Sequence, residues 1–170
     1  MSHAAAHLAN LDLTTLAERL GRLCRQQGAT VTAAESCTGG GVASAITAVA
    51  GSSDYFETGY VTYANAAKTR LLGVPEALLE AHGAVSREVV EAMVAGACRD
   101  SGATLGVAIS GVAGPGGGSD DKPVGTVWLA WGDAGSAEAE CFHFPGDRRA
   151  VRERAVREAL VGLVRRLEAR

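Results

Sequence analysis

Apolar residues recur along this chain in two spacing patterns, one typical of helices and one typical of strands. Leu13, Leu16, Leu20 and Leu23 lie at the three-to-four-residue spacing of one helix face, which Gly28 can end. Short runs rich in apolar and β-branched residues lie between the helical segments, as expected for strands. The patterns predict strands at 30–34, 56–63, 105–109, 126–131 and 139–144, and helices that begin near Leu13, Val42, Asn65, Pro75, Ser86 and Asp147.

The order of these segments indicates the architecture. Strands alternate with helices over the first two-thirds of the chain, and the last two strands are joined by a short turn. This order predicts an α/β fold, a three-layer α/β/α sandwich around a mixed, mostly parallel sheet with a C-terminal antiparallel hairpin. Residues 1–10 lack such a pattern and are expected to form a disordered tail. Residues 11–170 are expected to form a single domain.

Composition narrows the possible partners. The chain has 170 residues, of which 47% are hydrophobic and 21% charged, as in ordinary globular domains. Its net charge of −3 provides no positive field that would attract nucleic acid. No apolar run reaches the ~20 residues that span a bilayer, and the start lacks a signal-peptide pattern. We therefore expect a cytoplasmic protein with neither nucleic-acid nor membrane partners.

The cysteines give no sign of a metal centre. None of the four belongs to a Cys-x-x-Cys pair, and none has a histidine neighbour at ligand spacing. We accordingly expect no metal and no cofactor. They are Cys24, Cys37, Cys98 and Cys141.

The segment Glu35-Ser36-Cys37-Thr38-Gly39-Gly40-Gly41 joins a predicted strand to a predicted helix. Such a turn lies at the carboxyl edge of the sheet, where open α/β sheets bind ligands. Ser36 there can attack a carbonyl, while amides near Thr38, Gly39 and Gly40 hold the resulting oxyanion. Helix capping or simple anion binding explains the same residues. The turn lacks the lysine of a P-loop and the glycine spacing of a dinucleotide fold.

A serine nucleophile needs a base, and no histidine is well placed for that role. His3, His7, His82 and His143 have no marked acidic partner in the sequence. Tyr63 and Lys68 form a better pair, in which a desolvated ammonium near the phenol lets Tyr63 take the proton from Ser36. The alternative is that Tyr63 is a strand aromatic and Lys68 a solvated helix residue.

Many ordered motifs make the chain resemble the CinA C-terminal domain family, over a stretch from about Leu16 to the end. The resemblance implies an amidohydrolase that converts nicotinamide mononucleotide to nicotinic acid mononucleotide and ammonia. It also implies a Ser-Tyr-Lys catalytic set on Ser36, Tyr63 and Lys68, and a homo-oligomer. The matching segments are 34–40, 50–53, 61–65 with Lys68, 71–74, 83–86, 109–115, 117–119, 122–127 and 144–148. Two positions, Ala66 and Gly116, depart from the family pattern and leave substrate fit open.

Four further positions are candidates for substrate binding. Ser110 and Gly111 open a long glycine-rich loop that follows a buried strand, and long loops in compact domains are usually functional or disordered. Asn65 belongs to the motif around Tyr63 and can cap the helix that follows. Arg148 starts the last helix and can bind a substrate phosphate, or it is a surface arginine. Cys37 is a rival nucleophile, and a regulatory module that binds a nucleotide without turnover is the alternative function.

Overall fold

Five strands form one sheet in the order β2-β1-β3-β4-β5 in the computed structural model, which describes residues 7–170. The three strands β2, β1 and β3 run parallel, whereas β4 and β5 are antiparallel to their neighbours. The predicted mixed sheet with a C-terminal hairpin is therefore confirmed. The strands are β1 (Val31–Glu35), β2 (Phe56–Val61), β3 (Leu105–Gly111), β4 (Thr126–Gly132) and β5 (Ala137–His143).

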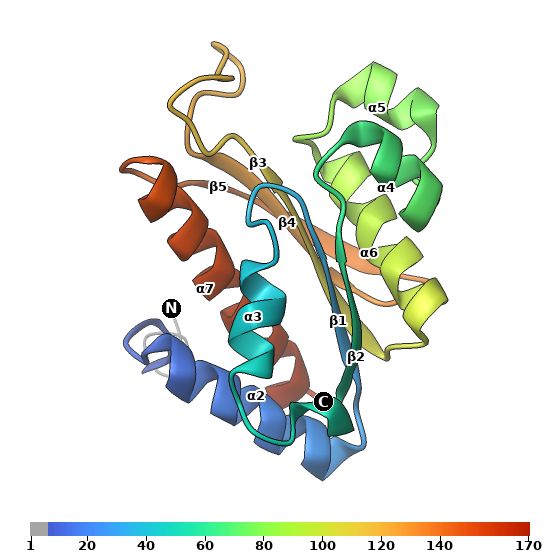
Figure 1. Cartoon of the computed structure of the whole chain (residues 1–170), viewed down its shortest axis with the longest axis vertical. Coiled ribbons are helices and arrows are strands. Elements are labelled where there is room, and N and C mark those ends of the chain that lie inside the picture. Colours follow the sequence, from blue (N-terminus) through green and yellow to red (C-terminus); the bar gives the residue numbers. More distant parts are fainter. Residues whose placement is uncertain (1–6) are drawn as a thin grey trace.

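Helices cover both faces of the sheet and complete the predicted three layers (Figure 1). One layer holds α2 (Leu13–Gln27), α3 (Gly41–Thr47) and α7 (Arg148–Glu168), and the other holds α4 (Asn65–Leu72), α5 (Glu76–His82) and α6 (Arg87–Ser101). A short 3-10 helix, η1 (Ser52–Asp54), precedes β2. Each layer has its own buried apolar cluster. No helix in residues 7–170 is both long and apolar enough to cross a bilayer.

The parallel pairing brings the carboxyl ends of three strands to one edge of the sheet. Glu35 pairs with Val61 on one side and with Ile109 on the other, so β1 ends level with β2 and β3. The ladders run slightly further, since the Ser36 amide donates to Ile109 O at 3.0 Å and the Thr62 amide to Glu35 O at 2.8 Å. The segments that follow these three strands therefore all start at the same edge of the sheet, the upper one in the view of Figure 1.

Several details differ from the sequence predictions. Strand β2 ends at Val61, before Tyr63. The N-cap of α4 is Ala64, without a side-chain capping bond, and Asn65 is the first helical residue, so the predicted Asn65 cap is wrong. Of the predicted tail, residues 1–6 lie outside the described residues. Residues 7–9 are helical, and Leu8 packs in the core because its side chain has an apolar surface to cover.

Helix α4 sits on α6 at a point where only glycine fits. A Cβ on Gly96 of α6 would collide with the carbonyl of Leu72 at the end of α4. The glycine therefore sets how closely α4, which carries Lys68, approaches α6.

We expect Gly96→Ala to lower the free energy of unfolding by about 1–3 kcal/mol, because overpacking against backbone outweighs the better helix propensity of alanine. Urea unfolding measures this loss. Gly116→Ala is the matched control, since a Cβ there meets nothing within 4 Å. An unchanged or raised unfolding midpoint for Gly96→Ala would contradict the close α4–α6 contact.

Candidate active site

Ser36 is the first residue after β1 and is held by the sheet itself. Its side chain is 9% exposed, and its amide is fixed by the bond to Ile109 O. The register sets it beside Thr62, after β2, and Ser110, near the end of β3. Both neighbours are buried, and Thr62 Oγ1 has no hydrogen-bond partner among the described residues. Three hydroxyl-bearing residues thus meet at the sheet edge.

Lys68 reaches Ser36 from the first turn of α4. It is 1% exposed, and its Nζ donates to Ser36 Oγ at 3.1 Å, to Thr62 O at 2.9 Å and to Tyr63 O at 3.4 Å. Burial lowers the pKa of this amine, because desolvation disfavours the charged form. A neutral amine has two N–H donors and one lone pair. It can therefore donate to both carbonyls and accept the proton of the Ser36 hydroxyl.

Tyr63 lies differently from the sequence prediction. Its side chain is 60% exposed, and Arg148 Nη2 donates to the phenol oxygen at 2.9 Å. Lys68 contacts the backbone carbonyl of Tyr63, and its partners do not include the phenol. The chain has already left the sheet at Tyr63, so the phenol projects to the rim while Lys68 turns inward. The predicted pairing of the ammonium with the phenol is therefore not what the structure contains.

A buried carboxylate organises the turn after Ser36. Glu35 is 0% exposed, and its Oε1 accepts from Thr38 Oγ1 at 2.6 Å and from the Val42 amide at 2.8 Å. Its Oε2 accepts from the Ala43 amide at 3.1 Å. The carboxylate thus caps the start of α3, where orphan amides and the helix dipole favour negative charge. An acidic residue that ends an apolar strand just before a helix is a signal for this role, but no capping role was predicted for Glu35 from the sequence.

The glycines of the turn are required by its backbone. Gly39 and Gly40 have φ of +58° and +103°, in the left-handed region that disfavours residues with a Cβ. The Gly39 amide donates to Ser36 O at 3.0 Å, so it is already used within the turn. No hydrogen bond from the amides of Thr38 or Gly40 to another residue is found within 7–170. Of the three predicted oxyanion donors, these two are available.

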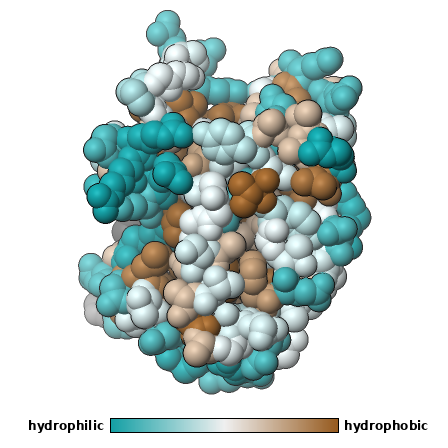
Figure 2. All heavy atoms as spheres, viewed as in Figure 1, coloured by the Kyte–Doolittle hydropathy of each residue, from teal (hydrophilic) through white to brown (hydrophobic). Residues whose placement is uncertain are grey.

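Arginines from α7 border the same edge. Arg148 Nη1 donates to Gly114 O at 2.9 Å, and Arg152 donates to the carbonyls of Cys37 and Thr38. Nothing in the sequence singled out Arg152. Figure 2 shows the resulting hydrophilic surface over the start of α7. A cavity of about 660 Å³, within the size range of small-molecule sites, is lined here by Ala113, Pro115, Val124, Gly146, Asp147, Arg148, Arg149 and Arg152.

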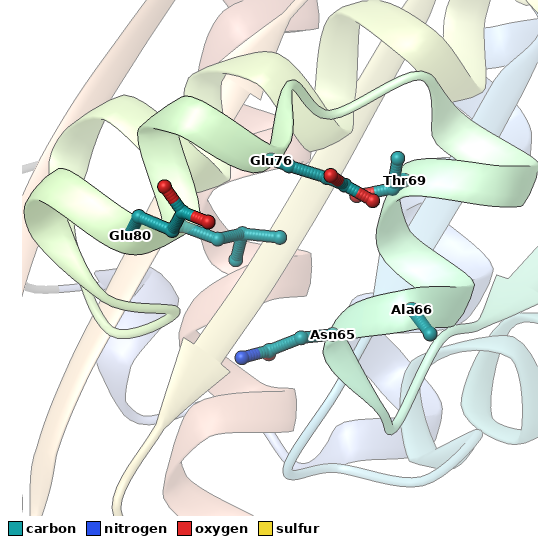
Figure 3. Close-up of a pocket in the computed structure, with 6 residues that line it drawn as sticks. Asn65, Ala66, Thr69, Glu76 and Glu80 are labelled. Atoms are coloured by element: carbon teal, nitrogen blue, oxygen red, sulfur yellow. The ribbon is translucent and has the colours of Figure 1, made fainter.

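The other predicted substrate-binding residues fall in different places. Asn65 lines a separate cavity of about 430 Å³ between α4 and α5, opposite Glu76 and Glu80 (Figure 3). Gly111 packs against β4, since a Cβ there would lie 2.6 Å from Val127 Cγ2. Only Ser110 is adjacent to Ser36 in the strand register. The structure therefore brings Ser36, Lys68 and Ser110 together and leaves Asn65 apart.

Cys37 is a poor candidate for the rival nucleophile. It is 6% exposed and belongs to the apolar cluster beneath α3 and α7. Burial raises the pKa of its thiol to about 11, so the thiolate is scarce near neutral pH.

Comparison with known proteins identifies the family of this chain. Residues 13–167 match the family described as the CinA C-terminal domain. The chain is 64% identical over 152 residues to "Nicotinamide-nucleotide amidohydrolase PncC" of Pseudomonas putida, covering 89% of this chain and 95% of that protein. It is 53% identical over 148 residues to a "CinA-like protein" of Citrifermentans bemidjiense, covering 87% of this chain but only 36% of that longer protein. A crystal structure of a CinA superfamily protein from Klebsiella pneumoniae superposes with a TM-score of 0.90 at 40% identity, covering 94% of this chain and all of that one.

We expect Glu35→Gln to lower the free energy of unfolding by about 1–3 kcal/mol. The side-chain NH₂ of glutamine cannot accept a hydrogen bond, so a donor that one carboxylate oxygen now satisfies would lose its acceptor. Chemical denaturation measures the loss. Glu57→Gln, on the exposed side of edge strand β2, is the matched control and should change little. Equal effects of the two substitutions would argue against the capping role of Glu35.

Proposed function

Because the chain belongs to the CinA C-terminal domain family, we propose that it hydrolyses the carboxamide of nicotinamide mononucleotide, giving nicotinic acid mononucleotide and ammonia. Support comes from the 64% identity to a nicotinamide-nucleotide amidohydrolase that the chain covers almost completely. A cytoplasmic location and a homo-oligomer stay predictions.

One observation carries the mechanism: the buried Lys68 amine lies 3.1 Å from Ser36 Oγ. In the proposed reaction, neutral Lys68 takes the hydroxyl proton as Ser36 Oγ bonds to the carboxamide carbon. Lys68 then returns that proton to the departing nitrogen, the C–N bond breaks, and ammonia leaves. Water, deprotonated by the same amine, attacks the ester, and the acid is released with Ser36 restored.

Other residues hold the substrate around this centre. The amides of Thr38 and Gly40 are proposed to bind the oxyanion, and the buried Ser110 hydroxyl to bind the carboxamide. Tyr63 stays in the proposed catalytic set, as a donor at the rim whose phenol is oriented by Arg148. Arg148 itself is proposed to bind the nucleotide phosphate, since guanidinium groups recognise phosphate through paired N–H bonds.

The nucleophile is tested by ammonia release from the nucleotide. We expect Ser36→Ala to reduce turnover by a factor on the order of 10⁴ or more, because no intermediate ester can form. Cys37→Ala, one residue away, should keep most of the activity. Full activity in Ser36→Ala, or loss only in Cys37→Ala, would reassign the nucleophile. Binding of the nucleotide without any ammonia from the wild-type protein would favour a regulatory module instead.

The base is tested by the pH dependence of kcat/KM. Burial lowers the pKa of Lys68, and only its neutral form accepts a proton. We therefore expect kcat/KM to rise with pH through this lowered pKa and then level off, in a series from about pH 6 to 9. Lys68→Met should lose turnover at every pH. A profile that falls with rising pH, or Lys68→Met with wild-type turnover, contradicts the assignment.

A further inference from the structure

Arg152, on the second turn of α7, holds the Ser36 turn by its backbone. Its Nε donates to Cys37 O at 3.1 Å, and its Nη2 donates to Thr38 O at 3.4 Å. A Cβ on Gly39 would lie 3.4 Å from Nη2, so the guanidinium lies directly against the turn. This contact joins α7 to a segment more than a hundred residues away in the sequence.

A second contact fixes the same face of α7. Val156 follows Arg152 by one helical turn, and its Cγ2 would lie 2.7 Å from a Cβ on Gly41 at the start of α3. The absence of a side chain at Gly41 therefore allows α7 to approach α3 closely. Arg152 therefore reaches the turn from a part of α7 that packs closely on α3.

Fixing a carbonyl also fixes the amide of the next residue. A trans peptide is planar, and its N–H points opposite to its C=O. The bond from Arg152 to Cys37 O therefore directs the Thr38 N–H away from α7. In the same way, the bond to Thr38 O directs the Gly39 N–H, which donates to Ser36 O at 3.0 Å. The Thr38 N–H, in contrast, meets no acceptor in residues 7–170.

We propose that Arg152 is a positioning residue for the oxyanion site, orienting the Thr38 N–H toward the oxygen that becomes negative when Ser36 attacks. This inference rests on the proposed function for the reaction. It assigns to Arg152 no contact with the substrate.

The direction of the two N–H bonds matters here more than the charge. Arg152 is exposed, so solvent screens its field, whereas its planar fork still determines where the two carbonyls point. Lysine at this position keeps the positive charge but loses the planar pair of N–H donors of the guanidinium. Arg152→Lys therefore separates geometry from electrostatics.

A phosphate-binding role predicts a different result. Arg152 lines the cavity of about 660 Å³ together with Arg148 and Arg149. If Arg152 bound the substrate phosphate, its loss would raise KM for the nucleotide and leave kcat unchanged. A positioning role acts only when charge develops on the oxygen, so it lowers kcat and leaves KM nearly constant.

The first measurement compares kcat and KM for Arg152→Lys, Arg152→Met and the control Arg154→Ala, an exposed arginine two residues along α7. We expect kcat to fall about 10- to 100-fold in both Arg152 variants, with KM within about twofold, because a misdirected donor loses part of its effect. Arg154→Ala should match the wild type. Unchanged kcat, or a raised KM alone, overturns the proposal.

The second measurement does not depend on the substrate. A fluorophosphonate labels Ser36 covalently: the Oγ–P bond forms, fluoride leaves, and Lys68 takes the hydroxyl proton. In this reaction the negatively charged phosphoryl oxygen accepts from the same oxyanion donor, the Thr38 N–H. Intact-mass kinetics should give about 10- to 100-fold slower labelling in Arg152→Lys, with an unchanged thermal midpoint. A lowered midpoint with wild-type labelling means a purely structural role and overturns the proposal.

The two measurements separate this inference from the proposed function. If the wild-type protein releases no ammonia but labelling slows in Arg152→Lys, the positioning role stands and the substrate assignment fails. If ammonia is released and Arg152→Lys equals the wild type in both assays, the proposed function stands and the positioning role fails.

Discussion

The site depends on one constraint, the burial of the Lys68 amine against Ser36. A desolvated ammonium is unfavourable, and the two backbone carbonyls of Thr62 and Tyr63 are what make the buried position tolerable. When the amine is neutral, as the proposed reaction requires, these two carbonyls use both of its N–H donors and leave its lone pair for the Ser36 hydroxyl. The burial that lowers the pKa of Lys68 thus also holds its amine against Ser36 Oγ, which is the arrangement that the proposed role of Lys68 as a base requires.

The sheet order makes this contact possible. Strand β2 lies beside β1 and runs parallel to it. The segments that follow these two strands therefore start next to each other at the same edge of the sheet. A helix of one or two turns after β2 then suffices to bring Lys68 over Ser36. The close approach of α4 to α6 at Gly96 helps to fix the position of that helix.

The turn after Ser36 is held from two sides. Glu35 binds its hydroxyl and the amides of α3 from below, while Arg152 binds its carbonyls from α7. A negative side chain thus binds the Thr38 hydroxyl and the first amides of α3, and a positive one binds two carbonyls of the turn, which limits the orientations open to its peptide planes. Rigidity of this kind favours catalysis, because donors that are already oriented need no rearrangement as charge develops.

Local patterns determined much of the fold, since periodicity, β-branched runs and turn residues are properties of short segments. They predicted the layers, the mixed sheet and the position of Ser36 at the sheet edge, whereas the place of Lys68 in the site was implied only by the resemblance to the family. The direction of each side chain depended on packing between distant segments, and only the tertiary structure decided it. Strand β2 ends early enough for the Tyr63 phenol to reach Arg148, and the exposed Asn65 faces α5 across a separate open cavity. The contact of Arg152 with the Ser36 turn spans more than a hundred residues, a separation across which local pattern carries no information.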